Sequence, residues 1–153
     1  MSPATVRRRV EATPDDVWAV LADGWTYAGW VVGASRIRAV DVGWPAPGTR
    51  IHHSVGVWPL LTDDHTEALA AEPGRLLTLR ARAWPVGEAR VDLRLEASGA
   101  AGTLVTMEED VVAGPGRLLP RPARDVLLAQ RNTEALRRLA HLAEGRTTSG
   151  LSA

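Results

Sequence analysis

The chain contains no cysteine and no lysine among its 153 residues. The lack of cysteine excludes disulfide bonds, zinc-thiolate sites, iron-sulfur clusters and a thiolate nucleophile. The lack of lysine excludes Schiff-base chemistry and the lysine-bearing phosphate loop of many nucleotide-binding proteins. A chain of this length forms one ordinary domain and buries roughly 68 to 70% of its unfolded surface, so it needs neither a metal nor a crosslink to build a core.

An excess of either charge is also missing, because 18 basic residues, all arginine, balance 18 acidic ones. A nucleic-acid surface would need a basic face, so we expect no nucleic-acid partner. The apolar runs are far shorter than the ~20 residues that cross a bilayer, and the first residues contain no apolar signal segment. We therefore expect a cytoplasmic protein with no membrane span, no metal and no cofactor.

Hydrophobic periodicity and turn residues predict one strand, two short helices, six further strands and a long helix. After a strand over residues 4–12, Thr13 caps a helix that opens with Pro14 and two acidic residues and stops at Gly24. Residues 25–30 form a second helical turn or a compact loop that buries aromatic rings. Alternating residues then predict strands over 35–41, 49–58, 62–71, 75–84, 87–97 and 103–112, which are antiparallel because the turns between them are short.

A helix over about residues 122–144 supplies the cover that one face of this sheet needs. Its inner face repeats at spacings of four and three residues and consists of Leu128, Asn132, Ala135, Leu139 and Leu142. We expect Gly145 to end the helix and residues 146–153 to form a disordered polar tail. The domain then spans residues 1–145 and has an α+β fold, in which a curved seven-stranded antiparallel sheet wraps around the last helix.

One motif and one later residue carry a resemblance: Pro14-Asp15-Asp16-Val17-Trp18 opens the first helix, and Trp30 follows it. With the element order, they resemble the helix-grip proteins of the START or Bet v 1-like (SRPBCC) superfamily, and within it the bacterial polyketide cyclase/dehydrase-like branch. The resemblance covers residues 6–144 and implies a cavity for an apolar small molecule between the sheet and the long helix. Members include lipid carriers, hormone-binding proteins and aromatase/cyclases, so it leaves catalysis open.

Adjacent histidines, His52 and His53, lie on the third predicted strand. Successive side chains of a strand point to opposite faces, so the two cannot chelate one metal ion together. His53 shares its face with Ile51 and Val55 and is expected to point inward. It is either a proton carrier in the cavity or a core histidine bonded to a neighbour.

Glu109 and Asn132 are the other inward polar candidates. Glu109 shares its face of the last strand with Met107, and Asn132 interrupts the apolar face of the long helix. Glu109 is either a carboxylate in an apolar cup or a solvated acid at the rim, and Arg131 could pair with it. Asn132 either orients a ligand carbonyl or hydroxyl group or makes a buried structural hydrogen bond.

All six tryptophans lie before residue 85, and three of them, Trp44, Trp58 and Trp84, precede proline. Proline stops a strand ladder, so the last two mark strand ends that an antiparallel meander brings to one edge of the sheet. We predict that Trp58 and Trp84 flank the mouth of the cavity. A packed end-cap and a protein interface are the alternatives for this edge.

These features support two hypotheses of function. In the first, the protein binds an apolar lipid, polyketide or aromatic metabolite, as a monomer or homodimer. In the second, it is a polyketide cyclase/dehydratase-type enzyme, in which His53 or Glu109 moves a proton and Asn132 or Tyr27 polarises a carbonyl group. The residues expected to contact the ligand are Tyr27, Trp30, Ile37, His53, Val55, Val57, Trp58, Leu79, Ala81, Trp84, Leu93, Met107, Glu109, Leu128 and Asn132.

Overall fold

The structure, a computed structural model, describes residues 4–55, 61–83 and 87–152 and has the predicted order of elements. Two short 3-10 helices, η1 and η2, are added to that order. In chain order the elements are β1 (Ala4–Val10), α1 (Pro14–Ala22), η1 (Gly24–Thr26), α2 (Tyr27–Trp30), β2 (Ala34–Val40), β3 (Arg50–Val55), β4 (Thr62–Glu72), β5 (Leu76–Ala83), β6 (Gly87–Ser98), β7 (Gly102–Ala113), η2 (Pro115–Leu118) and α3 (Arg121–Ser152).

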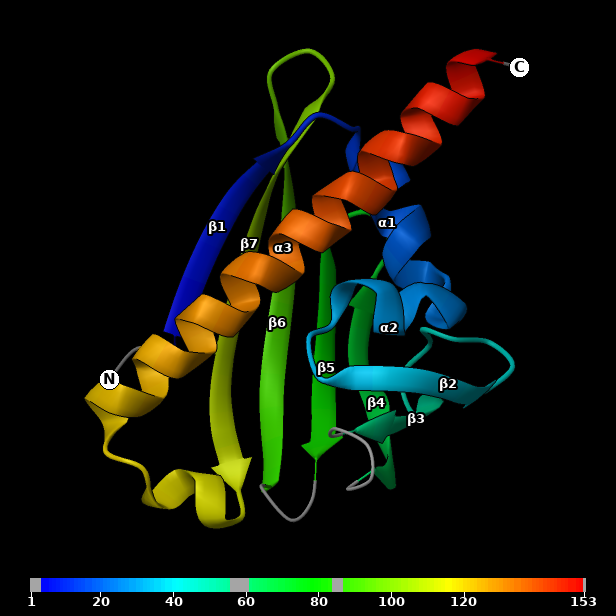
Figure 1. The fold of residues 1–153 in the computed structure, drawn as a ribbon. Helices are drawn as coiled ribbons and strands as arrows, with labels where there is room; N and C mark the ends of the chain where they lie inside the picture. The colour runs from blue at the N-terminus through cyan, green and yellow to red at the C-terminus, as the bar shows by residue number, and fades with distance from the viewer. Residues whose placement is uncertain (1–3, 56–60, 84–86, 153) are drawn as a thin grey trace.

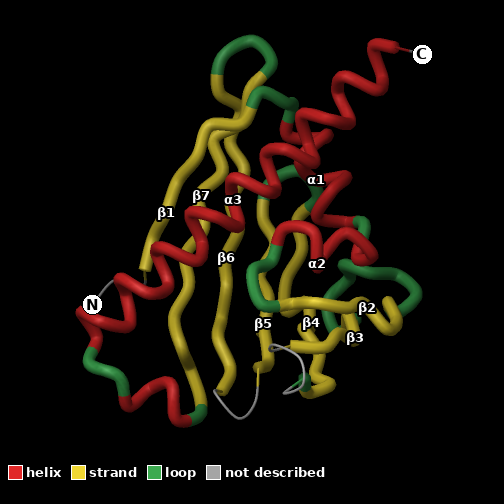
Figure 2. Tube along the Cα trace, in the orientation of Figure 1, coloured by secondary structure: helices red, strands yellow, loops and turns green. Residues whose placement is uncertain are grey.

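The seven strands form one antiparallel sheet in the order β1-β7-β6-β5-β4-β3-β2. Strands β2 to β7 pair with their neighbours in sequence, whereas β1 pairs with β7 and places Ala4 opposite Glu109. The long helix α3 crosses the inner face of the curved sheet (Figure 1). Helices α1 and α2 lie on the same side and contact α3 (Figure 2). The predicted fold class, a helix-grip arrangement of sheet and helix, is confirmed.

Local signals explain how the chain enters the helical layer after β1. The Thr13 hydroxyl accepts a hydrogen bond from the backbone N–H of Asp16 at 3.2 Å and caps α1. Pro14 occupies the first turn, together with Asp15 and Asp16, whose charges complement the positive end of the helix dipole. The residues that α1 buries are Val17, Val20 and Leu21. The helix is therefore short, capped and held by its apolar face.

Helix α3 has the predicted inner face but not the predicted end. Leu128, Asn132, Ala135 and Leu139 are buried, as the spacing of four and three requires. The helix passes through Gly145 and continues to Ser152, beyond the predicted end at about residue 144. Gly145 is not among the glycines with positive φ. A glycine inside a helix costs only about 1 kcal/mol relative to alanine, which a long helix tolerates.

The core packs between α3, the two short helices and the inner face of the sheet. Its fully buried members include Leu77, Leu93, Leu136 and Leu139. The aromatic residues of α2 belong to it, because the rings of Tyr27 and Trp30 meet edge to face with centroids 5.5 Å apart. Within the described ranges, no helix is both long enough and apolar enough to cross a membrane.

Candidate functional site

A cavity of about 620 Å³ lies between the sheet, α2 and α3. Its wall is mostly apolar and contains several small residues, which leave the space that the core does not fill. A cavity of this volume suits a small organic ligand. Nine predicted residues line it: Tyr27, Trp30, Val55, Leu79, Ala81, Met107, Glu109, Leu128 and Asn132.

Six predicted residues remain, and the structure describes three of them. Val57, Trp58 and Trp84 lie outside the described residues, so the predicted mouth stays a prediction. Leu93 is fully buried in the core, and Ile37 packs half-buried against the core from β2. His53 is buried and its ring stacks on that of Tyr27, with centroids 5.5 Å apart. His53 therefore lies behind the cavity wall and Tyr27 lies in it.

The cavity wall also includes residues that sequence reasoning did not select. Several of them lie in the turn after α2, and two more, Arg131 and Ala135, lie on α3. Others come from the sheet. The additional residues are Val31, Val32, Gly33, Ala34, Thr62, Arg82, Gly87, Glu88, Ala89, Val91, Val111, Arg131 and Ala135. The strand residues Val91 and Val111 follow the same alternation as Leu93 and Glu109, so periodicity alone could have found them.

Glu109 is the centre of an inner polar cluster in this wall. Its side chain is only 1% exposed, because β7 points it inward beside Met107. One carboxylate oxygen accepts a hydrogen bond from Arg131, and the other accepts one from the Asn132 amide at 2.9 Å. Burial lowers the pKa of Arg131, but the negative charge of Glu109 and the hydrogen bond to it outweigh that effect and raise the pKa overall. Glu109 is thus a paired anion rather than a solvated rim acid.

Three buried polar side chains form a second series of contacts, which leads from Tyr27 in the wall to Thr66 and His53 behind it. His53 Nε2 lies 2.9 Å from the hydroxyl oxygen of Thr66, which lies 2.9 Å from the Tyr27 hydroxyl oxygen. Burial lowers the pKa of His53 to about 4, so the imidazole is neutral at pH 7. Burial also raises the pKa of Tyr27 to about 12, so its hydroxyl keeps its proton.

His53 and Glu109, the two candidate proton carriers, have different partners in the structure. His53 makes its hydrogen bond to Thr66, whereas both oxygens of Glu109 are occupied by Arg131 and Asn132. Alternation along a strand gives the face on which a side chain lies, but it does not give the residue that covers it. Here α2 places Tyr27 against His53, so the imidazole does not line the cavity.

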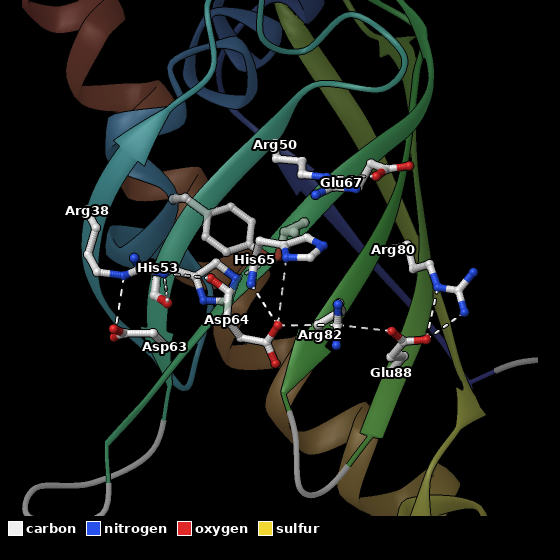
Figure 3. A network of polar contacts seen from close by, with 12 residues as sticks. Arg38, Arg50, His53, Asp63, Asp64, His65, Glu67, Arg80, Arg82 and Glu88 are labelled. Carbon is white, nitrogen blue, oxygen red and sulfur yellow. Dashed lines mark hydrogen bonds and ion pairs between the residues drawn. The ribbon is translucent and has the colours of Figure 1, made fainter.

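A charged cluster lies where β4 and β6 begin and β5 ends. Arg82 Nε is 3.3 Å from a carboxylate oxygen of Asp64 and 3.1 Å from one of Glu88, and Arg80 also binds Glu88, at 2.6 Å (Figure 3). Arg82 and Glu88 stand opposite each other in the ladder and both line the cavity. The opposite charges of Arg82 and Glu88, on either side of residues 84–86, are the sequence signal for this pair.

The adjacent histidines of β3 make separate contacts. No three histidine, aspartate or glutamate side chains in the part of the chain that the structure describes converge as a ligand set. His52, the neighbour of His53, instead bonds to Asp41 at 3.0 Å on the other face of the sheet. The two adjacent histidines thus have different partners, in keeping with their opposite directions along β3.

Replacing Arg131 by methionine is expected to destabilise the protein by about 2 kcal/mol, because it leaves the buried Glu109 carboxylate without its cation. The figure is below the value for a fully buried pair because the Arg131 side chain is 40% exposed. Urea unfolding measures the change. Arg137→Met, on the exposed face of the same helix, should leave the midpoint almost unchanged. The double variant Glu109→Gln/Arg131→Met should recover stability, and equal losses in Arg131→Met and Arg137→Met would contradict the pairing.

Comparison with known proteins gives a family and a fold. A family model described as polyketide cyclase/dehydrase and lipid transport matches residues 1–144. No curated protein matches the chain. Among solved structures, protein NE0264 from Nitrosomonas europaea is 15% identical with a TM-score of 0.71, and the alignment covers 96% of this chain and 97% of that one.

Two further structures have names that describe an activity. The Zhui aromatase/cyclase from Streptomyces sp. R1128 is 22% identical with a TM-score of 0.67, covering 94% of this chain and 93% of that one. The di-domain ARO/CYC StfQ from the steffimycin biosynthetic pathway is 12% identical with a TM-score of 0.67, covering 96% of this chain and 52% of that one. At these identities, the likeness shows a shared fold.

Proposed function

The chain belongs to the polyketide cyclase/dehydrase and lipid transport family, and we propose that it binds one apolar small molecule, such as a polyketide, lipid or aromatic metabolite, in its cavity. The observation that supports this most is the cavity itself, about 620 Å³ with a mostly apolar wall and one inner polar cluster. An apolar wall supplies most of the affinity, and a few polar groups orient the ligand. The ligand therefore carries an oxygen-bearing group on an apolar body.

The inner cluster favours binding over acid-base catalysis by its own carboxylate. Glu109 accepts hydrogen bonds at both oxygens, which orients the Arg131 guanidinium and the Asn132 amide in the wall. Arginine carries five N–H donors, so Arg131 retains hydrogen atoms for a ligand after it has bound Glu109. The cluster is therefore suited to holding an oxygen acceptor and not to removing a proton.

A cyclase or dehydratase activity is the second candidate. The family description and the donors of Tyr27, Arg131 and Asn132 at one wall favour it, because such donors stabilise an oxyanion as it forms. In this version the enzyme folds a reactive chain in a shaped cavity, and His53 and Glu109 serve as supporting groups. Turnover of an added poly-β-ketone thioester by the wild type and its loss in Arg131→Met would support the activity.

Filling the cavity should abolish ligand binding. Ala135 is 2% exposed on α3 and lines the cavity, so we expect Ala135→Trp to occupy the ligand volume and weaken binding of the dye 8-anilinonaphthalene-1-sulfonate by about tenfold or more. Dye fluorescence measures the affinity. The matched control is Ala123→Trp, on the exposed side of the same helix, which should bind as the wild type does. Equal affinity in both variants, each with a near-native thermal midpoint, would place the dye outside the cavity and sink the proposal.

A further inference from the structure

The buried polar groups of His53, Thr66 and Tyr27 hold a definite number of hydrogen atoms. Thr66 has 0% exposure, and its hydroxyl oxygen is 2.9 Å from both His53 Nε2 and the Tyr27 hydroxyl oxygen. The neutral imidazole carries one N–H, and each hydroxyl carries one O–H. Three hydrogen atoms therefore serve two hydrogen bonds, and the surroundings decide where the third one points.

Two of the arrangements leave a hydrogen atom buried without an acceptor. If Tyr27 donates to Thr66 and Thr66 donates to His53, the imidazole hydrogen lies on Nδ1, which is buried and has no partner among the described residues. If His53 and Tyr27 both donate to Thr66, the Thr66 hydrogen needs an acceptor, and the described part of the chain offers it no third partner. A buried donor without an acceptor is rare and costs about 1 to 3 kcal/mol.

The remaining arrangement leaves the spare hydrogen at a residue of the cavity wall instead of behind it. His53 Nε2–H donates to Thr66, Thr66 O–H donates to Tyr27, and the Tyr27 hydrogen is left for the cavity, whose wall includes Tyr27. His53 Nδ1 then carries no hydrogen, so the buried atom without a partner is an acceptor and not a donor. The His53 and Tyr27 rings, at the two ends of this hydrogen-bond chain, stack with an interplanar angle of 19°, which holds both in place. Each donated bond also polarises the next one.

From this geometry we propose that His53 and Thr66 are positioning residues that turn the Tyr27 hydroxyl hydrogen into the cavity, where it donates to a carbonyl oxygen of the ligand. The inference rests on the proposed function and narrows its ligand to apolar molecules that carry a ketone, ester or similar oxygen acceptor. Arg131 lies on the same wall and supplies a second donor. The Glu109 and Arg131 charges both act on the pKa of Tyr27, in keeping with their closeness.

The direction in which the His53–Thr66–Tyr27 hydrogen bonds are donated can be tested without any ligand. Nitrogen-15 NMR of labelled imidazoles distinguishes a proton on Nε2 from a proton on Nδ1. The arrangement we propose requires the His53 proton on Nε2 at neutral pH. A proton on Nδ1 reverses the chain, directs the Tyr27 hydrogen to Thr66 and overturns the inference, whatever the protein binds.

Ligand binding tests the consequence with two naphthalenes of nearly equal shape, 2-acetylnaphthalene with a carbonyl group and 2-ethylnaphthalene without one. Tyr27→Phe removes only the hydroxyl, so we expect it to weaken ketone binding by about threefold to tenfold, the range of one hydrogen bond, and to leave hydrocarbon binding unchanged. Thr66→Val should weaken ketone binding in the same direction, and Thr66→Ser should restore it. The stretching frequency of the bound carbonyl should rise in Tyr27→Phe.

The outcomes separate this inference from the function on which it rests. If the wild type binds neither naphthalene, the proposed function fails, and the inference fails with it. If it binds both and Tyr27→Phe leaves the ketone affinity unchanged, only the inference fails. Tighter ketone binding in Thr66→Val also overturns it, because a reversed chain would then have released the Tyr27 hydrogen.

Discussion

Leu139→Asp is expected to unfold the protein, and this is the largest effect that the structure predicts for one side chain. Leu139 is 0% exposed and lies in the core on the inner face of α3. The substitution removes an apolar side chain and buries a carboxylate without a partner, at a cost of several kcal/mol. That cost is comparable with the roughly 5 to 15 kcal/mol that holds a whole domain folded.

Circular dichroism and urea unfolding would measure the effect of Leu139→Asp. The matched control is Leu127→Asp on the same helix, because Leu127 is 56% exposed and its replacement puts the charge in water. Leu127→Asp should keep the native spectrum and a nearly unchanged midpoint. Similar midpoints for the two variants would mean that α3 presents a different face to the sheet.

The second large effect is a loss of stability on acidification that depends on His53. Burial lowers the pKa of His53 from 6.5 to about 4 in the folded protein. Between these pH values, the unfolded chain binds a proton at this position and the folded protein does not. Lowering the pH therefore stabilises the unfolded state relative to the folded state. The contribution of neutral His53 is complete above pH 6.5 and declines down to about pH 4. The decline amounts to about 3 kcal/mol.

Urea unfolding of the wild type and of His53→Gln at a series of pH values would test this dependence. The two proteins are compared by the slope of the unfolding free energy against pH and not by absolute stability, because the variant also loses the contact with Thr66. Burial lowers the pKa of His65 as well, so some dependence should remain in His53→Gln. Parallel curves for the two proteins would show that the imidazole of His53 gains no proton preferentially in the unfolded state.

Periodicity was sufficient to predict the fold and the direction of the chief polar residues. The spacing of four and three selects the buried face of α3, and alternation along β7 turns Glu109 inward beside Met107. These rules work because a side chain's direction follows from its own backbone. The end of α3 was not predictable in this way, because the helix tolerates Gly145 in its interior.

The partners of the polar residues were less accessible to sequence reasoning because they depend on tertiary packing. Tyr27 covers His53 from a different element, and a long flexible side chain brings Arg131 to Glu109. Arg131 is next to the apolar stripe and not in it, so the pattern left its pairing with Glu109 open. Arg82 reaches the cavity wall from a position that alternation assigns to the outer face, because it lies at a strand end.

The pairing of β1 with β7 determines when the sheet can be completed during synthesis on the ribosome. β1 is made before the other six strands, yet β7, its partner in the described sheet, contains Glu109 and emerges about one hundred residues later. Until then both edges of β1 are unpaired, and unpaired strand edges are sites for wrong associations in a growing chain. Tyr27, His53 and Thr66 have all emerged by that stage, whereas Arg131 and Asn132 follow β7. The cavity wall is thus completed only after α3 has emerged from the ribosome.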